Sequence, residues 1–468
     1  MTLSAQPLPD AHLRQEALRF LFDRIDYERG HIAADPTREF KLDRMRELLD
    51  RLGQPAATVP IVHIAGSKGK GSTAAMVAAV LTAAGLRTGR FTSPHLERVE
   101  ERMAVDGLPA TATEFVACFE RVRPAVEAMD RAAGASLAGP TYFEITTAMA
   151  LVHFARRRVE AAVLEVGMGG RLDATNVCRP QICAITSISL DHTKQLGDTL
   201  GAIAGEKAGI VKPGVPLVSG VCEDEPREVI REICRRRAAP LLELDVDFGF
   251  RYRPPRHLEQ APAVGRLDFL AHGPRVAGTR RGLALGLPGS HQAANAAVAL
   301  AVIGDLAARG WPIPAGAVRQ GLAGIAWPAR CEVAGRRPAV VIDAAHNTAS
   351  VAALAATLEE SFSVSRRILV FATTREKDIR GMLAVLLPCF DEVVFTRYWN
   401  NPRGVPPEEL AALAADQDER HHSVIEDPAE AWRQARAAAG PQDLICVTGS
   451  FFIAAEVRRL LQAASTAG

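Results

Sequence analysis

The chain is short of the features that would direct it to a membrane or to nucleic acid. It has almost no charge excess, since 55 Lys and Arg residues face 54 Asp and Glu residues for a formal net charge of +1. Such a balance produces no field that attracts nucleic acid or an anionic membrane surface, so we expect neither as a partner. No apolar run reaches the roughly 18 residues of a membrane span. The first residues also lack a basic region followed by an apolar core. These absences predict a cytoplasmic protein with no signal peptide and no membrane span.

Paired cysteines are lacking as well. The eight cysteines are scattered, and no two form a C-x-x-C motif. Free thiols in a reducing compartment are therefore expected, rather than a disulfide framework or a zinc site. What is present is the composition of an ordinary globular enzyme, with 48% hydrophobic and 23% charged residues in 468. That length predicts about two to three domains.

One segment carries the clearest chemistry. The apolar run 59–65 predicts a buried strand, the sequence G-S-K-G-K-G-S at 66–72 a tight loop, and the Ala-rich stretch 74–84 a helix. Glycines let successive N–H groups turn inward, the helix N-terminus adds partial positive charge, Lys70 adds a point charge and Ser72 a hydroxyl. The predicted ligand is a nucleoside triphosphate with Mg²⁺. The alternative is a Gly/Ser turn with two solvated lysines.

Polar residues follow other predicted strands. Ser93, Asp191 and His192 each come shortly after an apolar run, and a glycine-rich loop follows the run at 161–166. The carboxyl ends of parallel strands meet at one edge of a sheet, which is where α/β proteins bind ligands. Glu144 stands among apolar residues in the first turn of a predicted helix, which suits a helix-dipole partner or a Mg²⁺ ligand. The alternatives are a turn residue for Ser93 and an exposed first-turn acid for Glu144.

The order of elements predicts two α/β domains. Strands alternate with helices between residues 59 and 220, which is typical of a doubly wound, mostly parallel sheet. Residues 243–287 indicate a small β-rich excursion on the same domain, and 324–330 a hinge before a second α/β series. We therefore predict an N-terminal P-loop ATPase-like doubly wound domain at 1–325 and a smaller C-terminal Rossmann-like α/β domain at 326–468.

Nine short motifs stand in order along nearly the whole chain. They are A-G-S-K-G-K-G-S at 65–72, T-S-P-H-L at 92–96, F-E at 143–144, L-E-V-G-M-G-G-R-L-D at 164–173, D-H-T at 191–193, E-K-A-G-I at 206–210, G-S-H-Q-A-A-N at 289–295, W-P-A-R at 327–330 and D-A-A-H-N at 343–347. Each alone is weak, but nine in one order are hard to reach by chance. Together they resemble the Mur ligase superfamily, and within it folylpolyglutamate synthase and dihydrofolate synthase.

The resemblance implies an ATP-dependent amide ligase that acts as a monomer. In that reaction a substrate carboxylate attacks the γ-phosphate of ATP, and the amino group of L-glutamate then captures the acyl phosphate. The implied substrates are ATP, L-glutamate and a folate or dihydropteroate. The family's nucleotide contacts map onto Gly69, Lys70, Gly71, Ser72, Asn295, Arg330 and Asp343, and its Mg²⁺ ligands map onto Ser93, Glu144 and His192.

Lys70, Lys207 and His346 match the catalytic positions of the family. Lys207 matches a carbamylated lysine, and because a carbamate is an anion it could organise a second Mg²⁺. Burial alone could equally explain a lysine in its Ala/Gly/Ile segment. His346 and Ser450 match positions near the glutamate or the nucleotide, where an imidazole could clamp the acyl phosphate or accept a proton from the amine. Contacts from the hinge and the second domain imply that the chemistry needs domain closure.

Two departures from the family pattern stand out. Ser67 and Lys68 occupy positions where many relatives carry Thr-Asn, which adds a cation that either touches phosphate or faces water. Ala344 replaces a usual Gly, so the backbone there would tolerate a positive φ less well. Two other functions stay open: a Mur-type ligase for a cell-wall nucleotide precursor, and a nucleotide-binding regulatory or scaffold protein without catalysis. The sequence leaves open whether a folate ligase adds the first glutamate, later ones, or both.

Overall fold

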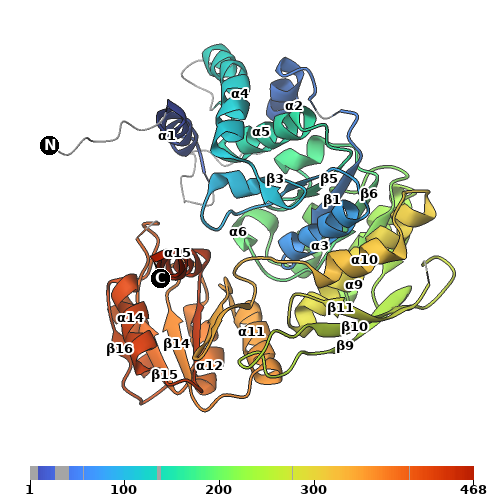
Figure 1. Cartoon of the computed structure of the whole chain (residues 1–468). Coiled ribbons are helices and arrows are strands. Elements are labelled where there is room, and N and C mark those ends of the chain that lie inside the picture. Colours follow the sequence, from blue (N-terminus) through green and yellow to red (C-terminus); the bar gives the residue numbers. More distant parts are fainter. Residues whose placement is uncertain are drawn as a thin grey trace. The chain divides into compact units, whose positions relative to one another are not determined.

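The chain forms two compact units. The computed structural model describes residues 9–26, 42–55, 57–133, 139–276, 278–399 and 401–467. Unit 1 comprises Met1–Phe250, Phe269–Arg281 and Ala294–Gly324, and unit 2 comprises Arg251–Asp268, Gly282–Ala293 and Ile325–Gly468. Figure 1 shows the elements of both units in sequence colours. Within the described part of the chain, no helix has the length and apolar character needed to cross a membrane.

Unit 1 is built on an eight-stranded sheet with the order β4-β3-β2-β5-β1-β6-β7-β8. Strand β1 pairs in parallel with both β5 and β6, and β2 pairs in parallel with β5. Every residue of β1 and β5 is buried, as expected for apolar strands covered on both faces. The predicted doubly wound parallel sheet is therefore confirmed. The strands are β1 Ile61–Ala65, β2 Thr88–Phe91, β3 Met103–Val105, β4 Leu108–Pro109, β5 Ala161–Glu165, β6 Ile182–Ile185, β7 Leu217–Ser219 and β8 Leu241–Glu243.

The short strands β3 and β4 pair antiparallel and extend one edge of this sheet. The sequence analysis did not predict them, because two or three residues are too few to display a period.

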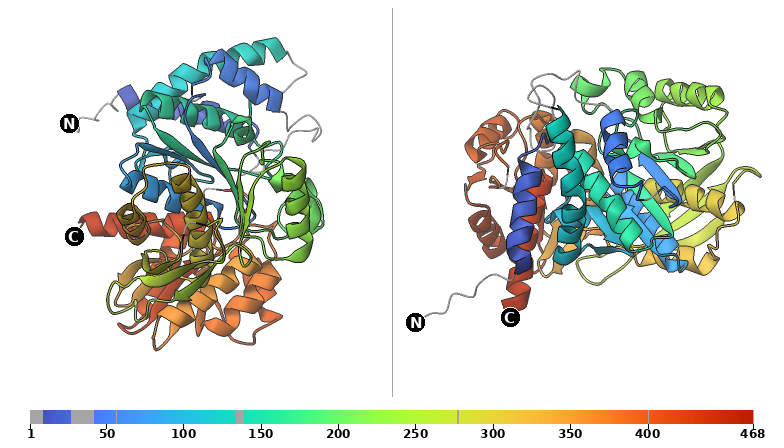
Figure 2. Two further views of the ribbon diagram at one scale, coloured as in Figure 1. Left: turned by 90° about the vertical axis from the view of Figure 1, so that its right-hand side faces the viewer. Right: turned by 90° about the horizontal axis from the view of Figure 1, so that it is seen from above.

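Helices cover both faces of the unit 1 sheet. Gly321 on α10 lies so close to α3 that a Cβ would meet the backbone of Val80 at 2.7 Å, so glycine permits this approach. Helices α1 and α4 lie side by side (Figure 2), with the rings of Phe20 and Phe119 5.3 Å apart. The helices are α1 Pro9–Phe22, α2 Leu42–Arg51, α3 Lys70–Ala83, α4 Ala112–Ala133, α5 Tyr142–Arg156, α6 Thr193–Leu196, α7 Leu200–Ala208, α8 Asp224–Arg236, α9 Ser290–Ala308 and α10 Ala315–Ala323, with η2 Val99–Arg102 and η4 Ala174–Val177.

The four central strands of unit 1 end at one edge. Ile64 of β1 lies opposite Glu165 of β5 and opposite Ala184 of β6, so these strands are in register up to their last residues. Phe91, the last residue of β2, lies opposite Leu164. The loops that follow β1, β2, β5 and β6 therefore emerge together, at the edge where open α/β sheets bind ligands.

The β-rich segment forms a separate three-stranded sheet with the order β11-β10-β9. Its strands are β9 Phe248–Arg253, β10 Gly265–Ala271 and β11 Arg280–Leu285. The division into compact units assigns Arg251–Asp268 and Gly282–Ala293 to unit 2, so residues of this sheet belong to both units.

Unit 2 contains a six-stranded sheet with the order β12-β13-β17-β14-β15-β16. Strands β13, β17, β14 and β15 pair in parallel, and β12 joins antiparallel at the edge. The strands are β12 Glu332–Arg336, β13 Ala339–Ile342, β14 Arg367–Phe371, β15 Glu392–Phe395, β16 Ser423–Val424 and β17 Leu444–Thr448. The helices are α11 Thr348–Ser361, α12 Ile379–Leu386, α13 Pro407–Ala415, α14 Pro428–Ala438 and α15 Phe451–Ala467, with η5 Leu387–Cys389. The predicted second α/β fold is thus confirmed.

Candidate active site

The glycine-rich loop after β1 passes directly into a helix. Helix α3 begins at Lys70 rather than at the expected Ala74, so Gly71 and the buried Ser72 lie in its first turn. Gly69 is the N-cap residue with a φ of 81°, and a Cβ there would meet Oδ1 of Asn295 at 2.1 Å. The positive φ at 69 favours glycine, and a larger residue there would also displace the side chain of Asn295 on α9, the predicted nucleotide contact that lies against the loop.

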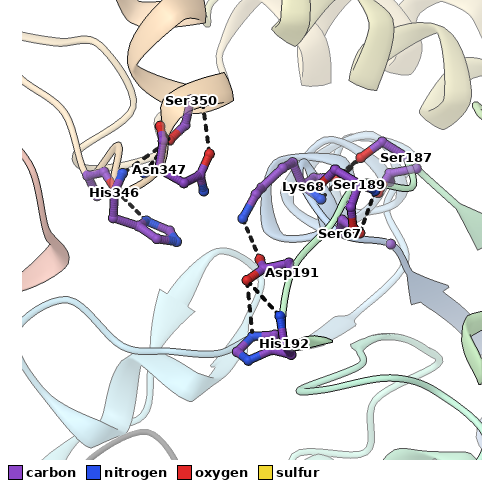
Figure 3. A network of polar contacts seen from close by, with 12 residues as sticks. Ser67, Lys68, Ser187, Ser189, Asp191, His192, His346, Asn347 and Ser350 are labelled. Carbon is purple, nitrogen blue, oxygen red and sulfur yellow. Dashed lines mark hydrogen bonds and ion pairs between the residues drawn. The ribbon is translucent and has the colours of Figure 1, made fainter. Parts of the chain in front are cut away.

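The segment that follows β6 is hydrogen-bonded to this loop. The Ser67 N–H donates to the Ser187 carbonyl at 2.7 Å, and the Ser67 hydroxyl donates to the Ser189 carbonyl at 3.1 Å (Figure 3). The Thr186 hydroxyl donates to the Lys68 carbonyl at 2.5 Å. Hydroxyl side chains thus fix the loop backbone, and the sequence analysis missed their role because they lie more than a hundred residues away along the chain.

Three lysines gather around the loop. Burial lowers the pKa of Lys70, which the negative charge of Glu165 raises in part. Lys207 on α7 is 4% exposed and its Nζ donates to the Gly66 carbonyl at 3.1 Å. Burial first, and then the charge of Lys70, lower the pKa of Lys207 to about 7. The Lys68 Nζ donates to Asp191 Oδ2 at 2.5 Å (Figure 3).

Glu165 is the buried carboxylate at this strand edge. It is the last residue of β5 and is 4% exposed. The backbone N–H of Ser93, which follows β2, donates to Glu165 Oε2 at 3.0 Å. The sequence analysis included Glu165 in a motif but gave it no role. Its signal was available: a carboxylate ending an apolar strand beside the phosphate-loop strand.

His192 follows Asp191 in the loop after β6. Its φ is 52° and its side chain is 48% exposed, so the imidazole is accessible. The His192 N–H donates to Asp191 Oδ1 at 3.1 Å (Figure 3). The topology thus brings the loops that carry Ser93 and His192 to the same edge as the phosphate loop.

Glu144 has a different environment. It is 6% exposed and accepts two hydrogen bonds from Arg44 Nε, at 3.0 and 2.8 Å. Its carboxylate also accepts the Thr141 N–H at 2.7 Å, which completes a capping box at the start of α5. The alternative of an exposed first-turn acid is wrong. Partners for a buried carboxylate were expected, and the helix cap and Arg44 provide them.

The glycine-rich loop after β5 is held by an acid of its own. Asp173 Oδ2 accepts the N–H groups of Gly167 at 3.0 Å and Met168 at 3.1 Å. The Thr175 hydroxyl donates to Asp173 and lies 2.8 Å from Nε2 of the fully buried His63. Asp173 therefore orders this loop at the site's edge, another role that the sequence analysis did not assign.

Unit 2 has a polar strand edge of its own. Asp343 follows β13, is 8% exposed, and accepts the N–H groups of Cys331 at 2.6 Å and Ala345 at 2.7 Å. Burial raises the pKa of Asp343, while the positive charge of Arg330 lowers it. Asp343 and Arg330, both predicted nucleotide contacts, are thus close enough for their charges to interact. Ala344 does not adopt a positive φ, so alanine is accommodated there without strain.

His346 and Arg330 share an aromatic neighbour in unit 2. The Arg330 guanidinium lies 4.9 Å from the centre of the Phe451 ring, and the His346 ring lies 5.5 Å from it. The His346 Nδ1 is 2.9 Å from the Ala344 carbonyl, and the backbone N–H of His346 donates to Ser350 Oγ (Figure 3). Ser450, next to Phe451, is 2% exposed and its Oγ accepts the Ile453 N–H at 3.2 Å. Phe451 had no signal in the sequence.

The donor set of the unit 1 edge is suited to a hard cation. Among the residues that the structure describes, no three His, Cys, Asp or Glu side chains are grouped to hold a metal ion by themselves. The edge instead combines the hydroxyl of Ser93, the carboxylates of Glu165 and Asp191 and one imidazole. Oxygen donors of this kind suit Mg²⁺ or Mn²⁺, whose remaining ligands are commonly water and phosphate.

Two family models match the chain. Residues 64–303 match the Mur ligase middle domain, and residues 329–451 match the Mur ligase, glutamate ligase domain. The first match begins within β1 and spans the phosphate loop. The second contains Asp343, His346 and Ser450.

Named relatives resemble the chain over most of its length. It is 35% identical to a dihydrofolate synthase/folylpolyglutamate synthase of Bacillus subtilis, over 90% of this chain and 95% of the relative. A Mycobacterium tuberculosis folylpolyglutamate synthase, solved with ADP and AMPPCP, superimposes with a TM-score of 0.85 at 35% identity, covering 97% of this chain and 99% of that one. A bifunctional enzyme of Yersinia pestis, solved with AMPPNP and a Mn ion, has a TM-score of 0.79 at 29% identity over 98% and 100% of the chains.

Proposed function

The chain belongs to the Mur ligase family, within its folylpolyglutamate synthase and dihydrofolate synthase group, and from this premise we propose its reaction. It is an ATP-dependent ligase that joins L-glutamate to the carboxylate of a folate or dihydropteroate. The observation that carries the proposal is the phosphate loop with its gathered lysines, in a chain that covers 95% of the Bacillus subtilis enzyme. Because that relative bears both activity names, either pterin is a substrate candidate. Nothing in the site favours a cell-wall precursor.

The reaction has two transfers. A carboxylate oxygen of the pterin substrate attacks the γ-phosphorus of ATP, and ADP leaves to give an acyl phosphate. The nitrogen of glutamate then attacks the acyl carbon, phosphate leaves, and the nitrogen loses a proton as the amide forms. Both transfers involve concentrated negative charge, so catalysis depends mainly on positioning and electrostatic stabilisation.

The loop residues have distinct tasks in this scheme. Gly69, Gly71 and Ser72 offer backbone N–H groups and a hydroxyl at the start of α3, where the helix dipole favours anions. Lys70 supplies a point charge to the phosphates. Asn295, which lies against Gly69, contacts the nucleotide from α9.

The proposed metal ligands are Ser93, Glu165 and His192. We replace Glu144 with Glu165, because Glu144 is engaged by Arg44 and its own helix cap, whereas Glu165 ends β5 beside Ser93. A bound Mg²⁺ would offset phosphate charge and align the γ-phosphate. Ser93 and Glu165 would provide oxygen ligands for it. The carboxylates of Glu165 and Asp191 add negative charge to the edge.

Lys207 is proposed to carry a carbamate. A pKa of about 7 leaves much of its amine neutral at physiological pH, and a neutral amine is the form that attacks CO₂. The product is an N-carboxylate anion and a released proton. That anion would support a second metal ion, in place of the cation that now donates to the Gly66 carbonyl.

Unit 2 is proposed to serve glutamate and nucleotide. Arg330 and Asp343 contact the nucleotide, and His346 and Ser450 contact glutamate or the acyl phosphate, with His346 accepting the proton of the amine. This assigns ATP binding to a domain at 1–325 and glutamate ligation to one at 326–468. We also propose that the protein acts as a monomer, which light scattering after size exclusion tests.

The test is phosphate release from ATP and Mg²⁺ in the presence of glutamate. Dihydropteroate, tetrahydrofolate and no pterin are compared, with Lys70→Ala as the inactive control. We expect glutamate-dependent release with at least one pterin, and the responsive pterin identifies the reaction. Silence with both pterins, while ATP still binds, would overturn the proposal and favour a binding role.

A further inference from the structure

Lys68 is held differently from the other lysines of the phosphate-loop region. Lys207 is buried and donates to a backbone carbonyl, whereas the Lys68 side chain is 29% exposed and its Nζ lies 2.5 Å from Asp191 Oδ2. The Asp191 side chain is itself 19% exposed. The sequence suggested that Lys68 either touches phosphate or faces water. Its ammonium instead binds a carboxylate of the neighbouring loop.

The backbone of Lys68 is held by hydrogen bonds, whereas its ammonium is held by an ion pair with Asp191. Its carbonyl accepts the hydroxyls of Thr186 at 2.5 Å and Ser187 at 3.2 Å, and its N–H donates to Ser187 Oγ at 3.1 Å. A lysine side chain has a flexible four-carbon stem and ends in a compact charge. The ammonium can therefore change partner by side-chain rotation alone, without any movement of the loop.

The ion pair lies close enough to Lys70 for both of its charges to act on that amine. Burial is the main reason that the pKa of Lys70 is low, but the charge of Lys68 lowers it further and the charge of Asp191 raises it. Both groups thus act on the amine that meets the phosphates. A partly exposed ion pair shifts an equilibrium by at most about fivefold. An incoming triphosphate with its divalent ion offers a stronger partner to each member of the pair.

We propose that Lys68 is a positioning residue that exchanges partners, holding Asp191 in the free protein and passing to the triphosphate as Asp191 turns to the divalent ion and its water shell. This inference rests on the proposed function, because it assumes that the loop binds a nucleotide with its metal. It concerns position 68, where this chain has a lysine and many relatives carry an asparagine. An asparagine has no positive charge to offer either to Asp191 or to a phosphate.

The exchange predicts effects of opposite sign on two ligands. In Lys68→Asn, Asp191 is relieved of the ammonium, so Mn²⁺ alone should bind up to about fivefold more tightly. The same variant loses a cation from the phosphates, so AMPPNP with Mg²⁺ should bind at least about tenfold more weakly. Electron paramagnetic resonance measures free Mn²⁺, and calorimetry measures AMPPNP binding. A merely structural role for the ion pair would weaken both ligands together.

Three variants serve as controls. Lys68→Arg keeps the charge and should return both affinities to within about twofold of the wild type. Asp191→Asn should reverse the pattern, with weaker Mn²⁺ binding and unchanged or tighter binding of AMPPNP without metal. Arg51→Gln breaks an exposed ion pair with Glu47 on α2 and makes the same charge change away from the site, so it should move neither affinity. Thermal melts confirm that each variant is folded.

The outcomes separate the two proposals. Opposite shifts in Lys68→Asn support the exchange, whereas parallel losses or unchanged affinities overturn it. If the wild type binds AMPPNP but releases no phosphate with glutamate and either pterin, the ligase proposal fails. The partner exchange is then still judged on the two affinities alone.

Discussion

Glu144 and Glu165 are both buried carboxylates in unit 1, but the regions that hold them differ at each contact. Glu144 stands in the first turn of α5, where Arg44 and the Thr141 N–H take up both of its oxygens. Glu165 ends β5, where it accepts the Ser93 N–H and where its negative charge acts on Lys70 and on Arg90 of β2. The first carboxylate caps the start of a helix and pairs with an arginine. The second lies at the edge of the sheet where four parallel strands end, which is where α/β proteins bind ligands.

The difference teaches that burial alone does not identify a catalytic acid. Both residues are under 10% exposed, and both would be costly to bury without partners. What distinguishes them is their place in the fold: Glu144 completes a helix cap with Arg44, whereas Glu165 lies at the strand edge beside Ser93 and the phosphate-loop strand. The predictions on Glu165, Glu144 and Thr141 test this distinction, and one on Lys207 tests the electrostatics of the phosphate-loop region. They begin with the largest expected effect.

Replacing Glu165 with glutamine should abolish most of the activity. The amide keeps the shape and can still accept the Ser93 N–H, so the fold should persist, but the negative charge at the strand edge is lost. We expect kcat for glutamate-dependent phosphate release to fall by about 10²–10³. Unchanged circular dichroism and thermal midpoint would serve as the control. A fall of less than threefold would contradict the role given to Glu165.

Replacing Glu144 with glutamine should act on stability instead. Arg44 would keep its charge in a site where its side chain is 14% exposed, without the carboxylate that balances it. Breaking such a pair costs about 3 kcal/mol in the free energy of unfolding, measured by urea denaturation. Activity per folded molecule should stay within about threefold. The double replacement of Arg44 and Glu144 by methionine should recover most of the stability and keep the activity. If Glu144 were catalytic, the double variant would be inactive even when stable.

Lys207 makes the stability of the unmodified protein depend on pH. Its folded pKa of about 7 lies below the unfolded value of roughly 10.4, so the unfolded chain binds more protons between these values. Stability from this residue is therefore complete above the unfolded pKa and is lost as the pH falls toward 7. In CO₂-free buffer, Lys207→Met should remove on the order of 2 kcal/mol of the stability difference between pH 9 and pH 6. An identical pH dependence in both proteins would show that Lys207 titrates normally.

The smallest effect should come from the cap beside Glu144. The Thr141 side chain accepts the Glu144 N–H at 3.3 Å, so Thr141→Ala removes one acceptor from the start of α5. We expect a loss of about 1 kcal/mol in unfolding free energy with kcat unchanged. Thr141→Ser retains the acceptor and should behave like the wild type. A large loss of activity in Thr141→Ala would place the α5 region in the catalytic site after all.

The fold could be predicted further than the site. Apolar runs located β1, β2, β5 and β6 because parallel strands buried on both faces leave a continuous signal. Pairings within unit 1 join residues far apart in the chain, such as Arg44 with Glu144, Lys68 with Asp191 and Lys207 with the Gly66 carbonyl. No spacing rule within one element anticipates such contacts, so they became visible only with the tertiary structure.

The central claim is that Glu165, and not Glu144, holds the divalent ion. The most direct measurement is Mn²⁺ binding by electron paramagnetic resonance in the presence of AMPPNP, on the wild type, Glu165→Gln and Glu144→Gln, with each variant shown to be folded. We predict that Glu165→Gln loses at least about tenfold in Mn²⁺ affinity while Glu144→Gln matches the wild type. Loss of Mn²⁺ binding in folded Glu144→Gln, with Glu165→Gln unaffected, would contradict the account.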